Sequence, residues 1–205
     1  NLNEGKRVFK VSTPFDYYCL HNVPNTMFTK VICADGSTER IDISKMSFIP
    51  NGMYKEFEKL LAKNGEETVE ILHSYSAYER RKDNMSKEQT EEFKYPVIYL
   101  TLNNGALSLQ YSNTNQKGHF GTPKVIFSNG AASTPIIDEK GEYGMSDFAY
   151  AIVDETKNLP FIKKAMENPD FCKLMKFVEG NSSLHRYNRK AIALFRKDFW
   201  KEFLY

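Results

Sequence analysis

Three polar segments of the chain combine basic, amide and aromatic side chains. They span residues 78–87, 112–124 and 185–190, and the last of them, HRYNRK, is the densest. Lys and Arg side chains bind phosphate groups, and Asn, Gln and Arg side chains also hydrogen-bond the edges of bases. We therefore predict that these segments contact DNA; a solvated loop is the alternative for each. The candidate DNA-binding residues are Arg80, Arg81, Lys82, Asn115, Lys117, His119, Lys124, Arg186, Tyr187 and Arg189.

Signatures of catalytic chemistry are almost absent from the sequence. It has no Rossmann or P-loop glycine pattern, no nucleophile elbow and no HExxH motif, and its four His residues are scattered. Glu92 and Lys94 have the E-x-K spacing found in metal-dependent nucleases, with Asp83 as the upstream carboxylate. A Mg²⁺-dependent nuclease is therefore one alternative function.

The segment Asn168-Pro-Asp-Phe171 resembles the Asn-Pro-Pro-Tyr/Phe loop of amino-methyltransferases, with Asp in place of the second Pro. Asn is a favoured N-cap and Pro a favoured first helical residue, so the start of a helix explains the segment fully. We assign no catalytic residue, metal ligand or cofactor to this chain.

Composition is that of an ordinary globular domain, with 41% apolar residues, 26% charged residues and a net charge of +2. The 12 Tyr and 15 Phe residues indicate a β-rich core or, as an alternative, a Tyr-rich surface that binds a protein partner. Three distant Cys residues argue against disulfides and zinc, and no run of 18 apolar residues predicts a membrane span. We expect an intracellular, cytoplasmic protein in a reducing compartment, without a membrane partner.

Hydrophobic patterning predicts one α+β domain over residues 1–205, with mixed, mainly antiparallel sheets and several helices. Asp35-Gly36 and Asn103-Asn104-Gly105 are hairpin signals. The charged segment 74–94, with a capping-box pattern at Ser86 and Gln89, is expected to be a loop or an exposed helix. Strands are predicted at residues 8–11, 27–33, 39–43, 69–72, 96–102, 106–111, 125–127, 147–153 and 191–195, and helices at 53–65, 159–168, 169–180 and 197–204.

The order of several short motifs resembles a known family. PKVIFSNG is followed by GEYGMSDFAYAIVDE, by the helical FIKKAMENPDFCKLMKFV and by YNRKAIALFRKDFW. This series is similar to the C-terminal target-recognition region of adenine-specific DNA methyltransferases, above all the gamma-class enzymes and the fused restriction-modification polypeptides. The matching pieces are Pro123-Lys124, Gly141, Gly144 and Lys197-Asp198-Phe199-Trp200, within residues 95–205. No motif places residues 1–94.

The resemblance implies a target-recognition-domain-like fold and a sequence-specific DNA-recognition domain. The parent enzyme would be an adenine-N6 DNA methyltransferase, with or without a fused restriction function. Its S-adenosylmethionine would bind in a catalytic domain that this chain lacks, in cis or in trans. The implied partners are double-stranded DNA and that catalytic domain, and the implied role of this chain is specificity without catalysis.

Overall fold

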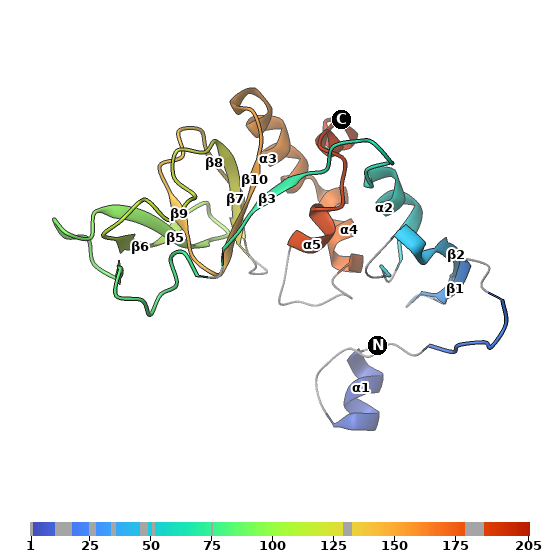
Figure 1. The fold of residues 1–205 in the computed structure, drawn as a ribbon. Helices are drawn as coiled ribbons and strands as arrows, with labels where there is room; N and C mark the ends of the chain where they lie inside the picture. The colour runs from blue at the N-terminus through green and yellow to red at the C-terminus, as the bar shows by residue number, and fades with distance from the viewer. Residues whose placement is uncertain are drawn as a thin grey trace.

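The computed structural model of the 205-residue chain describes residues 2–10, 18–24, 28–33, 36–45, 49–50, 52–74, 76–128, 133–178 and 187–205. It has the predicted α+β class, with mostly antiparallel sheets. Two four-stranded sheets and a group of helices form the main body, and a short hairpin precedes them in the chain (Figure 1).

The first sheet contains the strand within PKVIFSNG, the first of the ordered motifs described above. It comprises β3 (Glu70–Leu72), β7 (Lys124–Ser128), β8 (Ile136–Asp138) and β10 (Ala149–Val153), in the order β3-β10-β7-β8 and antiparallel throughout. β7 is buried along its whole length, as is nearly all of β10. Strands buried on both faces are unbroken apolar runs, which explains why VIF and FAYAIV were readable from the sequence.

The second sheet comprises β4 (Met85–Ser86), β5 (Tyr95–Thr101), β6 (Leu107–Ser112) and β9 (Gly144–Met145), in the order β4-β6-β5-β9. The hairpin predicted at Asn103-Asn104-Gly105 joins β5 to β6, and Gly105 has φ 77°, as its turn requires. β9 pairs parallel to β5. The capping box predicted in segment 74–94 is wrong: Ser86 belongs to β4, and its hydroxyl accepts from the Glu88 amide.

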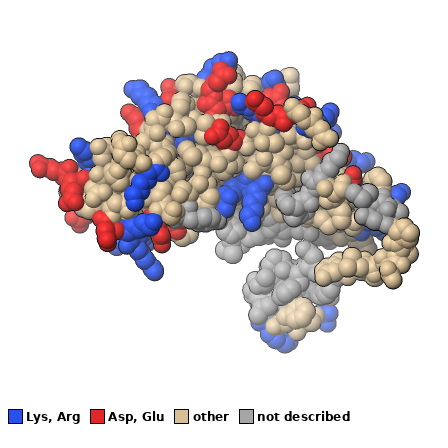
Figure 2. Space-filling model, viewed as in Figure 1, with Lys and Arg blue, Asp and Glu red and all other residues tan. Residues whose placement is uncertain are grey.

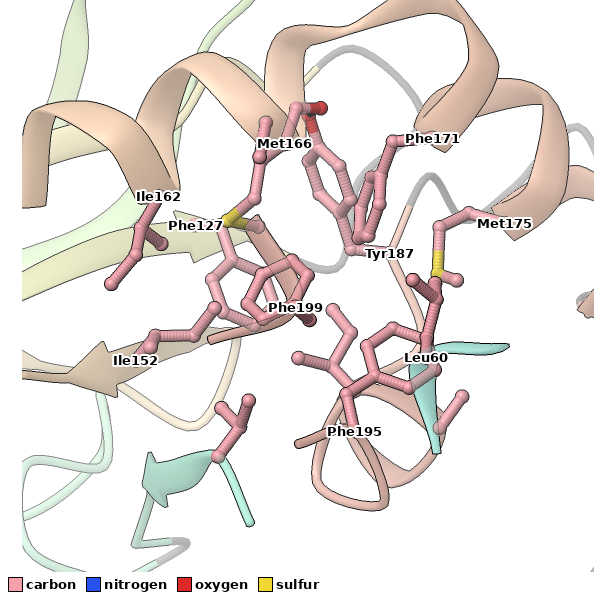
Figure 3. Close-up of a cluster of buried hydrophobic side chains, with 14 of the residues drawn as sticks. Leu60, Phe127, Ile152, Ile162, Met166, Phe171, Met175, Tyr187, Phe195 and Phe199 are labelled. Atoms are coloured by element: carbon pink, nitrogen blue, oxygen red, sulfur yellow. Dashed lines mark hydrogen bonds between the residues drawn. The ribbon is translucent and has the colours of Figure 1, made fainter. Parts of the chain in front are cut away.

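A group of helices packs on one face of the first sheet. It comprises α2 (Tyr54–Leu60), the 3₁₀ turn η2 (Thr156–Asn158), α3 (Leu159–Glu167), α4 (Pro169–Val178), α5 (Arg189–Ile192) and the 3₁₀ helix η3 (Phe199–Phe203). Of these, α3 contacts β7 and β8 directly. Figure 3 shows Phe127 and Ile152 from the sheet facing Tyr187, Phe195 and Phe199 from the C-terminal elements. Burial of this many large apolar side chains supplies most of the driving force for folding.

Two helical boundaries test predictions from the sequence. Asn168 Oδ1 accepts from the Asp170 amide at 2.8 Å, so the Asn-Pro-Asp-Phe segment is the start of α4, as interpreted. The strand predicted at residues 191–195 is wrong, because Asn188 caps a short helix there by accepting from the amides of Lys190 and Ala191. After this helix, Phe195 and Arg196 form isolated antiparallel β-bridges with Leu61 and Thr68.

The second sheet packs on the other face of the first. Ile98 of β5, Ile126 of β7 and Ala151 of β10 meet in this second core. The central strands are therefore enclosed between helices on one side and a sheet on the other, a layered α+β arrangement.

The N-terminal part holds α1 (Leu2–Phe9), β1 (Phe28–Ile32), β2 (Thr38–Asp42) and the 3₁₀ turn η1 (Ile43–Lys45). β1 and β2 pair antiparallel, as predicted, with Gly36 in the connection; Asp35 lies outside the described residues. The strand predicted at residues 8–11 is wrong, because Val8 and Phe9 form the last turn of α1. A four-residue apolar pattern is too short to distinguish a strand from a helix end.

Candidate nucleic-acid interface

Tyr78 brings two of the three predicted segments together. Its ring is fully buried, and its hydroxyl donates to Gly118 O and accepts from the Lys117 amide, both at 3.2 Å. The ring also contacts His119 and Phe120, with centroids 5.5 Å and 5.6 Å away. Loops 78–87 and 112–124, far apart in the sequence, therefore share one buried anchor.

A second link joins these loops nearer to solvent. Asn84 Nδ2 donates to Ser112 Oγ at 3.3 Å, and Asn84 Oδ1 accepts from Lys117 Nζ at 3.3 Å. We call residues 78–87 and 112–124 together the loop pair. β4 lies within the first segment, and β6 ends where the second segment begins. These two strands are adjacent in the sheet, so its register fixes the spacing of the two segments.

The loop pair presents three of the predicted basic residues to solvent. Arg80, Arg81 and Lys117 are exposed. Lys82 is half-buried and donates to Ser76 O at 2.5 Å, and half-buried Asn115 accepts from Gln116 Nε2 at 2.8 Å. Lys and Arg groups on a folded loop of this kind are suited to phosphate contacts.

A groove with a volume of about 280 Å³ lies beside the loop pair. The Arg80 guanidinium sits over the Tyr99 ring, 5.6 Å from its centroid. Tyr99 is at a β-bulge, since the pairing of β5 with β6 shifts register between Ile98 and Leu100, and a bulge re-aims the side chain at its position. We call this the Gln110 groove; it is lined by Arg80, Lys87, Tyr99, Ser108, Leu109 and Gln110.

The third predicted segment borders a different groove, with a volume of about 580 Å³. Half-buried Arg189 lies over the Tyr150 ring at 5.2 Å, and the His73 ring contacts the same Tyr150 at 4.7 Å. Burial, and then the charge of Arg189, lower the pKa of His73, which Asp147 opposes. We call this the α5 groove; it is lined by Thr68, Val69, Ile71, His73, Arg189, Lys190 and Ala193.

Two neighbouring residues of the turn between β9 and β10 interact with lining residues of the two grooves. Asp147 acts electrostatically on His73 in the α5 groove, and its neighbour Phe148 contacts Tyr99 in the Gln110 groove, with ring centroids 5.2 Å apart. Figure 2 shows Lys and Arg side chains beside α5 and, at the lower left of the view, around the loop that precedes β4. A few acidic side chains lie among the latter, so this face is mixed rather than uniformly basic.

Lys124 does not belong to this surface, contrary to the prediction. Its side chain is 0% exposed, and its ammonium donates to Asp138 Oδ2 at 2.6 Å, His119 O at 2.8 Å and Thr122 O at 3.2 Å. Burial lowers the pKa of Lys124, and the hydrogen bond to Asp138 offsets part of that effect. All three donors of the ammonium are used inside the protein, so none is left for a phosphate.

His119 is also removed from the candidate set, because it is only 4% exposed. Its backbone is left-handed, with φ 75°, and its Nδ1 accepts from the Met145 amide at 3.2 Å. Burial, and then the charge of Lys124, lower the pKa of His119 to about 4. The ring is therefore neutral near pH 7 and joins the loop pair to β9.

Tyr187 is the third correction. It is fully buried among Phe127 and Phe171, and its hydroxyl donates to Met166 O at 3.1 Å. An aromatic residue between basic ones looks like a base-stacking residue in sequence, yet here it belongs to the helical core. Arg186 lies outside the described residues.

Tyr99, Gln110 and His73 were missed as site residues. Tyr99 and Gln110 lie inside predicted strands, and His73 directly follows one. Their positions therefore indicated structural residues of a sheet rather than binding residues. The available signal was a polar residue inside an otherwise apolar strand, namely Gln110 in ALSLQY. Its significance depends on the neighbouring strands, which the sequence pattern does not order.

The nuclease alternative gains no support from the structure. β4 and β5 pair with opposite edges of β6, since Met85 and Tyr95 both face Ser112. Asp83 and Glu92 precede these two strands, which lie two strand spacings apart, about 10 Å. In the part of the chain that the structure describes, no group of three or more His, Cys, Asp or Glu residues could hold a metal ion.

Two other predictions from composition concern cysteines and membranes. Cys19 is exposed, Cys33 is buried and Cys172 is half-buried, and none of the three is in a disulfide with another described residue. Over the described ranges, no helix combines the length and apolar character needed to cross a bilayer.

Comparison of the chain with models of protein families, with curated proteins and with solved structures gives no match.

Proposed function

We propose that this chain is the sequence-specific DNA-recognition domain of an adenine-specific DNA methyltransferase or of a fused restriction-modification enzyme. The observation that carries the proposal is the loop pair: two polar segments anchored together by Tyr78, with Arg80, Arg81 and Lys117 exposed. Loops held by a rigid frame are the usual carriers of recognition. The stacked cation–ring pairs in both adjacent grooves add the groups that bind phosphates and bases.

The assignment to a methyltransferase rests on the order of motifs within residues 95–205. In the structure these motifs are β7, β10, the helices α3 and α4, and η3. A target-recognition-domain-like fold is part of the proposal. S-adenosylmethionine and the methyl-transfer step belong to a catalytic domain that would act with this chain in cis or in trans, and the chain itself supplies specificity.

We expect the double charge reversal Arg80→Glu/Arg81→Glu to weaken binding to a 20-base-pair duplex at least about tenfold at 50 mM salt. Each lost phosphate contact should also lower the slope of log K against log salt by about 1. Fluorescence anisotropy with a labelled duplex, repeated at several salt concentrations, measures both quantities.

A matched control reverses two exposed lysines of α2, Lys55→Glu/Lys59→Glu, at the opposite end of the main body (Figure 1). It changes the net charge by the same amount and is expected to leave most of the affinity intact. Equal losses in the two double variants would contradict a specific role for the loop pair. If the unsubstituted chain does not bind the duplex even at low salt, the proposed function is refuted.

A protein-binding module is the second candidate, and one observation favours it. Several large apolar side chains of the N-terminal part are exposed: Tyr18, Leu20, Val23, Phe28 and Ile32. Phe28 and Ile32 lie on one face of β1. Under the proposed function the partner at this surface is the methyltransferase catalytic domain. Stoichiometric co-purification with that domain, indifferent to salt, would distinguish this contact from DNA binding.

A further inference from the structure

The α5 groove lies along an open edge of the first sheet. β3 is the outermost strand in the order β3-β10-β7-β8, and among the described strands it pairs with β10 alone. The lining of the groove comes from residues 68–73, which contain β3, and from residues 189–193, in and directly after α5. Proteins usually cover or blunt such an edge, because its unpaired backbone groups bind other strands.

Hydrogen bonds in the neighbouring strands show which backbone groups of β3 face this edge. The amide of Ser128 in β7 donates to Ser133 Oγ at 2.8 Å, so it is the preceding residue that exchanges backbone hydrogen bonds with Tyr150 of β10. These bonds alternate along an antiparallel strand, so the even-numbered residues of β10 bond β7 and the odd-numbered ones bond β3. Their partners in β3 are residues 70 and 72. Ile71, between them, therefore directs its N–H and C=O away from β10.

The C-terminal segment pairs with β3 on the same edge as these two groups. The Val69 amide donates to Phe195 O at 2.9 Å. The Lys197 amide donates to Glu67 O at 2.8 Å. Val69 and Ile71 are two residues apart, so their backbone groups point to the same edge. The C-terminal segment covers this edge as far as Val69, and beyond it no described residue forms a backbone hydrogen bond with Ile71 there. One N–H and one C=O of the sheet are therefore open to the α5 groove, which Ile71 lines.

The wall opposite Ile71 is positively charged. Arg189 is half-buried over the Tyr150 ring, and Lys190 is exposed next to it in α5. Figure 2 shows Lys and Arg side chains beside this helix. Among the described residues that line the groove, none is Asp or Glu; Glu70 of β3 is exposed but lies outside the lining. The groove therefore favours an occupant with negative charge.

We propose that an acidic, extended segment of a partner protein binds in the α5 groove by adding a strand to the open edge of β3. The backbone of the segment exchanges hydrogen bonds with Ile71, as in other cases of strand addition. Side chains alternate along the segment, so every second one faces α5. There a carboxylate contacts Arg189 and Lys190, and a small or branched apolar side chain contacts Ala193. The inference goes beyond the proposed function and does not depend on it.

A single strand of DNA is the competing occupant, because Arg189 and Lys190 also suit phosphates. The backbone of Ile71 favours the polypeptide. An adjacent strand supplies both a donor and an acceptor at the spacing of the Ile71 N–H and C=O, whereas a phosphodiester backbone supplies acceptors only. The groove volume of about 580 Å³ is sufficient for a few residues of extended chain.

The test uses the full chain and a short fluorescent peptide in which Val and Glu alternate. Anisotropy measures its affinity, and NMR of the isotope-labelled chain measures amide exchange. At saturation, exchange of the Ile71 amide should slow at least about tenfold. The control is the same peptide with every second backbone amide N-methylated, which keeps its charge and side chains but loses hydrogen-bond donors. It should bind at least about tenfold more weakly.

Two pairs of variants separate the backbone contact from the charge contact. Ile71→Pro removes the N–H from the open edge, where proline is tolerated in strands, and Ile71→Ala shortens the same side chain but retains the N–H. The proline variant should bind the peptide at least about tenfold more weakly than the alanine variant. Lys190→Glu, which covers the case in which Ile71→Pro does not fold, should weaken binding about fivefold. Its control, Lys55→Glu on α2, should not.

Three results would overturn the inference: equal binding of the two peptides, unchanged exchange of the Ile71 amide at saturation, or displacement of the peptide by a smaller amount of oligo(dT) than of unlabelled peptide. Slow Ile71 exchange that requires only a high concentration of the chain itself would assign the edge to a second copy and would overturn it too. Duplex binding without peptide binding refutes this inference alone. Peptide binding without duplex binding refutes the proposed function alone.

Discussion

Replacing Lys124 with methionine is expected to lower the free energy of unfolding by about 3–5 kcal/mol, the typical cost of removing one partner of a buried ion pair. The substitution leaves the Asp138 carboxylate buried without its counter-charge and deprives the carbonyls of His119 and Thr122 of a donor. Urea unfolding monitored by circular dichroism measures the change, and the unchanged size of the chain keeps the m-value comparable.

Two further variants make this prediction specific. Lys163→Met breaks a partly exposed pair with Glu167 on α3 and should cost less than about 1 kcal/mol. Lys124→Met/Asp138→Asn removes both charges and should recover part of the loss, because the Asn oxygen can still accept from the turn that follows β8. A Lys124→Met cost no larger than that of Lys163→Met would show that the buried pair contributes little.

Acidification from pH 6.5 to pH 4 is expected to remove about 3 kcal/mol of stability through His119 alone. The pKa of this imidazole is about 4 in the folded chain, against an ordinary value of 6.5. Between these values the unfolded chain binds a proton that the folded chain does not, so stability falls as the pH falls. The stabilising contribution is complete above pH 6.5 and is lost as the pH approaches 4.

The variant His119→Asn isolates this contribution from that of the carboxylates. Asn tolerates the left-handed backbone at this position and retains an acceptor, but it does not titrate. Urea unfolding at several pH values should give a shallower loss of stability for His119→Asn than for the parent chain. A variant at exposed His21 serves as the control. Parallel curves for the parent chain and His119→Asn would contradict the role given to His119.

Local sequence patterns were sufficient to predict most of the secondary structure. The apolar runs in β7 and β10, the Asn-Asn-Gly turn and the Asn-Pro start of α4 each depend on neighbouring residues, which the sequence displays directly. The strand predicted at residues 191–195 is wrong, because tertiary packing and the Asn188 cap favour a helix there, although the residue types are common in strands.

The site was less predictable, because it depends on contacts between distant residues. Lys124 looked like a surface cation until the register of β7 with β8 placed it opposite Asp138. Gln110 and Tyr99 acquire a shared groove only through the β5 bulge and the approach of Arg80. Charge and amide content could identify the loop pair, but not which of its members would be turned inward.

Under the proposed function, the buried anchor at Tyr78 has a consequence for how the DNA preference of this chain could change. Its hydroxyl fixes the base of the second loop, while the tips around Arg80, Arg81 and Asn115 take no part in that anchor. Substitutions at the tips therefore leave the folding energy nearly untouched, whereas Tyr78 and Lys124 tolerate little variation. Related domains are expected to diverge freely at the tips over an invariant interior, and a grafted tip should transfer its preference without a redesign of the scaffold.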